Sequence, residues 1–192
     1  MDHKATLQAA LQQVRQDLVS KLDGLDEYQV RRPMVPTGTN LLGLVKHVGA
    51  VSLGYLSVVF DREPGYDLAA FFGDDEEDLW AKPTETRHSI TDLYAHAARV
   101  GDATVAALDL DSVGAVPWWP PERRAVTLQQ ILVHLINEVA RHAGQADILR
   151  EQIDGQAGRF AADPSLTGRT AEEWLGHRAR LEQAALEAAR RA

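Results

Sequence analysis

The stretch N-E-V-A-R-H-A-G-Q, residues 137–145, contains three side chains that can bind a metal ion or a polar ligand: Glu138, His142 and Gln145. At helical spacing all three continue an apolar stripe formed by Leu128, Ile131, Leu135 and Leu149. An ionised carboxylate in line with core residues costs free energy unless a partner compensates the charge. The first question that this sequence raises is therefore what Glu138 pairs with.

A second segment shows the same anomaly. Its apolar stripe is Leu44, Val51, Tyr55 and Val58, and His47 interrupts it. Residues at i and i+4 of a helix have Cβ atoms about 6 Å apart, so Glu138 and His142 can reach one ion, and His47 from a facing helix can complete the set. Two histidines, one carboxylate and an open position are typical of catalytic zinc. Alternatively, Glu138 pairs with Arg141 or His134 and binds no metal.

Two neighbours of this set could support it. His134 lies one turn before Glu138, where it either hydrogen-bonds the carboxylate or contacts a loop on the flank of the helix. Gln145 could orient a bound water or substrate, or it could make a hydrogen bond between helices. Neither choice follows from spacing alone.

The segment V-P-W-W-P-P-E-R-R, residues 116–124, precedes this helix and could close over the metal. Trp118 and Trp119 would then form an apolar wall for a substrate or a thiol. Arg123 and Arg124 could hold substrate carboxylates. The alternative is a rigid loop that packs on the end of the fold.

The elements that must position these residues are helices. Five segments have helical periodicity: Lys4 to Leu25, Asn40 to Phe60, Ser89 to Leu108, Thr127 to Gly155, and about 170–191. Capping boxes mark three of the starts, at Ser89–Asp92, Thr127–Gln130 and Thr170–Glu173. No strand pattern or internal repeat is present. We predict one all-α domain over residues 1–192, a four-helix bundle (core 4–155) with an appended C-terminal helix.

Composition excludes several function classes. The 192 residues carry a net charge of −8, which argues against nucleic acid or an anionic membrane as a partner. The chain has no cysteine, so any thiol must be a substrate. We expect no signal segment and no apolar run that reaches membrane-spanning length, and hence a cytoplasmic protein. The acidic run D-D-E-E-D, residues 74–78, lacks the ligand pattern of a calcium loop and predicts a solvated loop.

The stretches 39–56 (T-N-L-L-G-L-V-K-H-V-G-A-V-S-L-G-Y-L) and 128–155 resemble the DinB/YfiT-like superfamily of metalloenzymes. The resemblance implies an up-down-down-up bundle whose metal is held by one histidine of the second helix and two residues of the fourth. His47 falls on the first position and His142 on the last. Glu138 stands where the commonest pattern has histidine, and this is similar to the mycothiol-dependent maleylpyruvate isomerase branch.

The resemblance implies a metal-dependent enzyme that uses a low-molecular-weight thiol, mycothiol, as a transferase or isomerase. The thiol would attack an electrophilic small molecule. We expect zinc, with nickel, manganese or iron as alternatives. Two other functions fit the same ligands: a non-haem Fe(II) oxygenase, and a non-catalytic bundle that binds a metal or a partner protein. The oligomeric state stays open, with a homodimer as one option.

Overall fold

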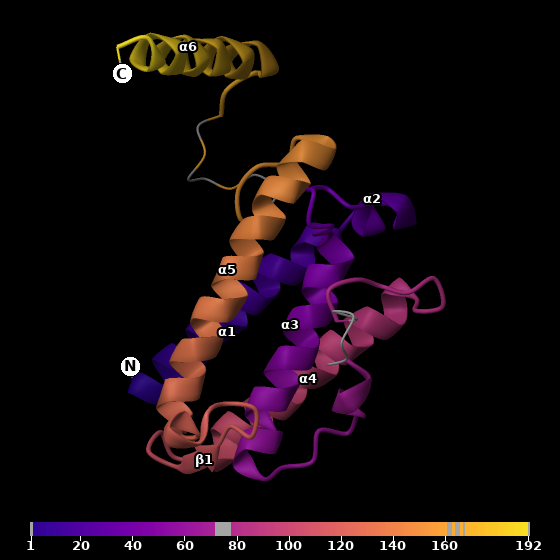
Figure 1. Cartoon of the computed structure of the whole chain (residues 1–192), viewed down its shortest axis with the longest axis vertical. Coiled ribbons are helices and arrows are strands. Elements are labelled where there is room, and N and C mark those ends of the chain that lie inside the picture. Colours follow the sequence, from indigo (N-terminus) through magenta and orange to yellow (C-terminus); the bar gives the residue numbers. More distant parts are fainter. Residues whose placement is uncertain (1, 72–77, 161–162, 164–165, 167, 192) are drawn as a thin grey trace.

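The structure is a computed structural model that describes residues 2–71, 78–160, 163, 166 and 168–191. Four long helices form its body: α1 (His3–Val19), α3 (Leu41–Leu56), α4 (Arg87–Ala107) and α5 (Leu128–Asp154). α1 and α5 run in one direction, whereas α3 and α4 run in the other (Figure 1). α3 packs against α4 and α5, and α1 packs against the same two helices. The predicted all-α, up-down-down-up bundle is therefore confirmed.

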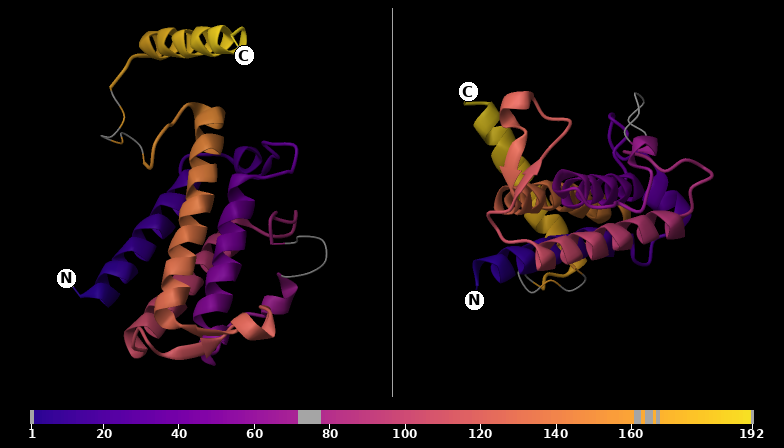
Figure 2. Two further views of the ribbon diagram at one scale, coloured as in Figure 1. Left: turned by 60° about the vertical axis from the view of Figure 1, so that its left-hand side comes forward. Right: turned by 90° about the horizontal axis from the view of Figure 1, so that it is seen from below.

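Short elements connect the long helices. A 3₁₀ turn, η1 (Ser20–Leu22), prolongs α1, and a short helix, α2 (Glu27–Arg31), precedes α3. Further 3₁₀ turns are η2 (Val58–Phe60), η3 (Leu68–Ala70) and η4 (Pro121–Arg123). An antiparallel pair of strands, β1 (Val113–Ala115) and β2 (Ala125–Thr127), lies at one end of the bundle (Figure 2). The sequence reading missed these strands, because three residues are too few to show an alternating pattern.

Side-chain caps fix where the helices begin. Thr127 and Gln130 form the predicted capping box of α5, and Gly155, with a φ of 80°, ends that helix. Asn40 caps α3 by accepting from the backbone N–H of Gly43. The predicted capping box at Ser89 is wrong. The cap of α4 is Thr86, whose side chain accepts from the N–H of Ser89, so the cap lies three residues earlier than predicted.

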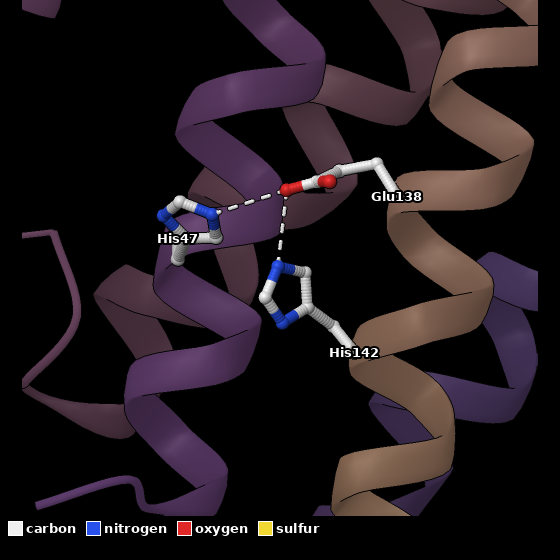
Figure 3. Close-up of side chains that lie close together, drawn as sticks. All are labelled: His47, Glu138 and His142. Carbon is white, nitrogen blue, oxygen red and sulfur yellow. Dashed lines mark hydrogen bonds and ion pairs between the residues drawn. The ribbon is translucent and has the colours of Figure 1, made fainter. Parts of the chain in front are cut away.

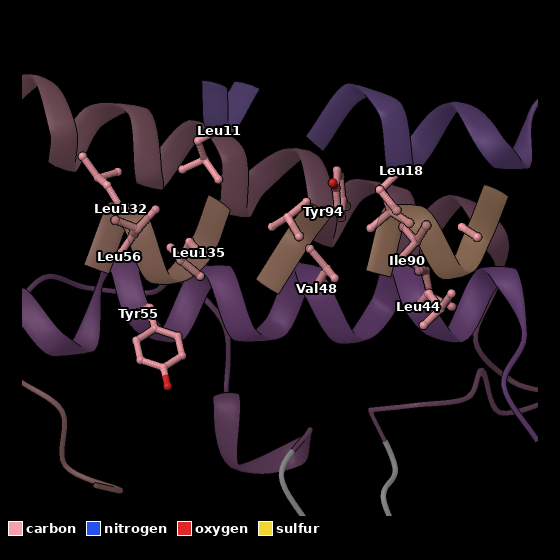
Figure 4. Close-up of a cluster of buried hydrophobic side chains, with 14 of the residues drawn as sticks. Leu11, Leu18, Leu44, Val48, Tyr55, Leu56, Ile90, Tyr94, Leu132 and Leu135 are labelled. Atoms are coloured by element: carbon pink, nitrogen blue, oxygen red, sulfur yellow. The ribbon is translucent and has the colours of Figure 1, made fainter. Parts of the chain in front are cut away.

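The hydrophobic core lies between the four long helices (Figure 4). α3 contributes most to it, and the segment Leu41–Phe60 is long and apolar enough to cross a membrane by composition alone. The expectation that no apolar run reaches this length is therefore wrong. However, 83% of that segment's most apolar window is buried inside the bundle, so its hydrophobicity is that of a core helix.

The C-terminal helix α6 (Ala171–Ala189) begins with the predicted capping box of Thr170 and Glu173. It has no buried residue, and Figure 1 and the left view of Figure 2 place it beyond the end of α5. The segment before it is tied to the bundle. Lys21 is fully buried, and its Nζ donates to the carbonyl oxygens of Gly158 and Arg159, each 2.6 Å away.

Candidate metal centre

α3 and α5 run antiparallel and bring three polar side chains to one point (Figure 3). Oε1 of Glu138 lies 3.0 Å from Nε2 of His142 and 3.5 Å from Nε2 of His47. The two imidazole rings stand edge to face with centroids 4.9 Å apart. One ligand atom from each of the three residues lies within 4.8 Å of the other two. We call these residues the metal triad, because they are the candidate ligands of a metal ion.

The metal triad lies at the edge of the core rather than inside it. The face of α5 that is fully packed in the bundle passes through Val139, Ala143 and Ala146. The Glu138 side chain is 28% exposed, and those of His47 and His142 are 17% and 13% exposed. The sequence predicts that Glu138 lies in line with the core residues of α5. In the structure the buried position is the next residue, Val139, and Glu138 lies beside it. A substrate can therefore reach the carboxylate from solvent.

Opposing effects set the protonation of Glu138. Burial raises the pKa of its carboxyl, but the hydrogen bonds and the electrostatic attraction from His142 and His47 outweigh burial. The pKa of Glu138 therefore lies below its ordinary value. The carboxyl is ionised at neutral pH, as a metal ligand has to be.

The far nitrogen of each imidazole has its own partner. Nδ1 of His47 lies 2.5 Å from Oδ2 of Asp78, and Nδ1 of His142 lies 2.8 Å from Oε1 of Gln145. When Nδ1 carries the proton and donates it to an oxygen, the lone pair of Nε2 is free to bind a metal. Both Nε2 atoms face Glu138, so a metal bound here would replace their hydrogen bonds to the carboxylate while Asp78 and Gln145 accept the protons on Nδ1. Gln145 thus bonds to a residue of its own helix, and this contact is neither of the two roles considered for it above.

Asp78 is the contact that the sequence reading missed. It ends the acidic run that was predicted to be solvated, but its side chain is only 12% exposed. The first four residues of that run, 74–77, lie outside the described part of the chain. The neighbouring apolar residues gave no signal of this contact, because Leu79 and Trp80 are themselves 36% and 43% exposed.

The donor set fits a divalent metal. Two ligand atoms that each lie about 2.1 Å from one ion in tetrahedral geometry are about 3.4 Å apart. The separations of 3.0 and 3.5 Å between Oε1 of Glu138 and the two Nε2 atoms are close to this value, and the three ligand atoms all lie within 4.8 Å of one another. Two imidazoles and one carboxylate leave a coordination position open, and both imidazoles already have the outer acceptors that metal-binding histidines use.

A hollow of about 480 Å³ opens beside Glu138. Its lining is Val51, Gly54, Tyr55, Trp118, His134 and Glu138, and we call it the ring cavity. The Tyr55 hydroxyl accepts hydrogen bonds from the indole N–H groups of Trp118 and Trp119, at 3.3 and 3.0 Å. This hydroxyl points away from the apolar cluster (Figure 4). The loop of residues 116–124, which we call the Trp118 loop, therefore contributes Trp118 to the wall of the cavity that Glu138 also lines.

His134 belongs to this wall. Its ring lies 4.7 Å from that of Tyr55 and 5.6 Å from that of Trp119, between centroids. Two roles were considered for His134, and the structure shows the contact with the loop. Within the described residues, which include both His134 and Glu138, the two make no hydrogen bond. His134 is thus part of the cavity and does not position the carboxylate.

Comparison with known proteins identifies the family. The family model described as mycothiol-S-transferase matches residues 6–155, which is most of the chain. The chain belongs to the mycothiol-S-transferase family. The predicted membership of the DinB/YfiT-like superfamily is confirmed by this match, and the metal triad, Asp78 and the Trp118 loop all lie within the matched residues. α6 lies outside them.

A solved structure agrees with the fold of this mycothiol-S-transferase family member. The crystal structure of a conserved protein from Enterococcus faecalis superposes with a TM-score of 0.58. The two chains share 20% sequence identity over 81% of this chain and 99% of the other. At this identity the likeness shows the fold alone. No curated protein sequence matches this chain significantly.

The two arginines of the loop lie apart from the ring cavity. Arg124 donates from Nε to the carbonyl oxygen of Trp119, at 2.8 Å, and the guanidinium of Arg123 lies 5.6 Å from the ring centroid of Trp119. Neither is among the residues that line the ring cavity in the described part of the chain. Their role in holding substrate carboxylates stays a prediction.

Proposed function

We propose that the protein is a metal-dependent mycothiol S-transferase whose metal is held by His47, Glu138 and His142. The family match supports the thiol and the reaction class. The observation that carries the proposal is that two imidazole Nε2 atoms and one carboxylate oxygen converge at the mouth of an apolar cavity. Zinc suits this ligand set best, since it accepts histidine and carboxylate in four-coordinate sites with an open position.

A bound divalent metal would supply a Lewis acid that lowers the pKa of a coordinated thiol. The protein's own residues do the remaining work. With a metal at the two Nε2 atoms, Asp78 and Gln145 would accept the Nδ1 proton of each imidazole and so hold the Nε2 atoms in position. The chain has no cysteine, so the sulfur nucleophile comes from the bound thiol.

The ring cavity would bind the electrophile. Its walls are apolar or aromatic apart from Glu138 and His134, which favours an apolar substrate and excludes water from the reacting atoms. Because the hydroxyl of Tyr55 holds both indole N–H groups, the wall is pre-formed and does not have to be ordered when the substrate binds.

The test is transfer of mycothiol to an alkylating electrophile such as a bromobimane. The metal-loaded wild-type protein should form the thioether, whereas Glu138→Gln and His142→Ala should abolish it. His88→Ala is the matched control, because this histidine is 86% exposed and lies apart from the site. A cobalt-substituted protein should show a sulfur-to-metal charge-transfer band when mycothiol is added. Absence of both the band and the thioether would overturn the proposal.

A further inference from the structure

A second hollow lies on the opposite side of the metal triad from the ring cavity. It has a volume of about 340 Å³ and is lined by Thr37, Gly38, Thr39, Leu44, Leu79, Trp80, His142 and Gln145. It shares Thr37, Thr39 and Gln145 with a hollow of about 630 Å³ that continues along α5 past Arg141 to Ile148. We call the two together the threonine groove.

The order of contacts along the two helices places the metal triad between the hollows. Along α5 the residues follow as His134, Glu138, His142 and Gln145, and α3 runs in the opposite direction, so Tyr55 lies near His134 and Leu44 near Gln145. The ring cavity contacts the triad through Glu138, whereas the threonine groove contacts it through His142. A metal here would be open to two reactants from two sides.

The threonine groove differs from the ring cavity in its chemistry. The hydroxyls of Thr37 and Thr39 lie 3.4 Å apart, and Gln145 and Arg141 line the same groove. Arg141 makes no hydrogen bond or ion pair with any residue in the described ranges, so its donors are free for a ligand. Trp80 is 43% exposed and offers a ring face. Hydroxyls, an amide and an exposed indole are what a carbohydrate ligand needs.

We propose that the threonine groove binds the sugar portion of the thiol co-substrate, while the ring cavity binds the electrophile. This inference rests on the proposed function. Mycothiol consists of N-acetylcysteine joined to a glucosamine–inositol unit that is rich in hydroxyls. With its sulfur at the metal triad, its sugar unit extends over His142 into the groove. Thr37, Thr39, Trp80 and Arg141 then determine which thiol the enzyme accepts.

The opposite orientation is disfavoured by desolvation. Sugar hydroxyls placed in the ring cavity would lose water and find few partners among Val51, Gly54 and the aromatic rings. Each buried hydroxyl that lacks a hydrogen bond lowers the affinity. In the threonine groove the same hydroxyls meet donors and acceptors and remain partly hydrated. An apolar electrophile has the reverse preference.

The experiment compares two thiols on the metal-loaded protein by isothermal titration calorimetry. Mycothiol carries the sugar unit, and N-acetylcysteine has the same reacting end without it. Wild-type protein should bind mycothiol more tightly. Trp80→Ala and Thr39→Val should each lower the affinity for mycothiol by about tenfold, because each removes one ring face or one good hydrogen bond. Both should leave the affinity for N-acetylcysteine unchanged. Trp174→Ala, which alters a tryptophan on α6 that is 40% exposed, is the matched control.

Each outcome decides a different statement. The proposal that the groove binds the sugar unit is supported if both groove variants lose affinity for mycothiol alone and keep their melting temperatures. The groove proposal is overturned if the wild-type protein has equal affinity for the two thiols, or if the variants lose affinity for both thiols equally. Either result leaves the proposed function intact. If neither thiol binds and no charge-transfer band forms with cobalt, the proposed function itself is overturned.

Discussion

At the scale of single residues, Asp78 contacts the outer nitrogen of His47 and would orient this imidazole toward a metal ion. Its carboxylate accepts from Nδ1 on the side of the ring that faces away from Glu138. A carboxylate in this position would fix the tautomer and the orientation of a metal-binding imidazole. Gln145 does the same for His142 with a neutral oxygen. The two histidines are therefore held by partners of different charge.

Asp78→Asn should weaken metal binding by about 10–100-fold, because outer hydrogen-bond partners of metal ligands have effects of this size. Competition with a chromophoric chelator measures the dissociation constant. The matched control is Asp92→Asn, which alters an aspartate that pairs with the exposed His88, 3.2 Å away. Equal metal affinity in the wild type and in Asp78→Asn would show that this contact does not tune the site.

The sequence predicts part of this site for a clear reason. Glu138 and His142 lie one turn apart on one helix, and His47 interrupts an apolar stripe, so periodicity alone singles them out. Asp78 lies 31 residues from His47, in a stretch without periodicity, and only the folded chain brings the two together. The burial of Glu138 is also mispredicted. Residue spacing shows which face of a helix a side chain lies on, but it does not show how much of that face the neighbouring helix covers.

At the scale of elements, the first half of α3 holds the segment that carries Asp78. Lys46 donates from Nζ to the carbonyl oxygen of Trp80, 3.0 Å away, and it pairs with Glu85 at 2.9 Å. Gly43 lets the Leu79 backbone approach closely, because a Cβ at position 43 would lie 2.0 Å from the Leu79 carbonyl oxygen. The metal triad thus depends on how closely this segment packs on α3.

Gly43→Ala should displace the backbone of Leu79 and withdraw Asp78 from His47. Overpacking of this kind costs about 1–3 kcal/mol, so both the melting temperature and the metal affinity should fall. Gly144→Ala is the matched helical control. Nothing lies within 4 Å of its added Cβ, and the change should stabilise the protein by about 0.5–1 kcal/mol. Metal titrations and thermal melts of both variants decide the matter; unchanged metal affinity in Gly43→Ala would contradict the coupling.

Helix ends were predictable where a side chain caps the backbone within a short stretch. Thr127 with Gln130 and Thr170 with Glu173 form the boxes that the sequence indicates. At α4 both Thr86 and Ser89 can cap, and the sequence reading chose the wrong one of the two. The strands β1 and β2 depend on a ladder between residues 113–115 and 125–127, and a local pattern does not reveal such pairing.

At the scale of the whole molecule, the bundle and α6 should be independent in stability. α6 has no buried residue, whereas the segment before it supplies carbonyl partners to the buried Lys21. Removal of residues 169–192 should leave the melting temperature unchanged. Removal of residues 156–192 should lower it, since Lys21 then loses two acceptors. Circular dichroism melts of the two shortened proteins test this. A large fall in the melting temperature on removal of residues 169–192 would show that α6 packs on the bundle or on a second copy.

Metal binding should stabilise the whole bundle, because the ion would link α3 to α5. Free metal at 100 times its dissociation constant adds about 2.7 kcal/mol to the free energy of unfolding. Each kcal/mol shifts the melting temperature of a chain of this size by about 2–4 °C, so chelation should lower it by about 5–11 °C. The helices should remain after chelation, since the apolar core does not involve the triad. Identical melts with and without chelator would contradict this link.

The most direct test of the central claim is the metal content of the purified protein and its variants, measured by mass spectrometry against protein concentration. We predict one bound divalent ion per chain in the wild type and in His88→Ala. His47→Ala, Glu138→Ala and His142→Ala should each lose it while keeping a helical circular dichroism spectrum. Glu138→Ala is the decisive variant, because its carboxylate is the group on which both imidazoles converge. If Glu138→Ala retains its ion in full, these three residues are not the metal site.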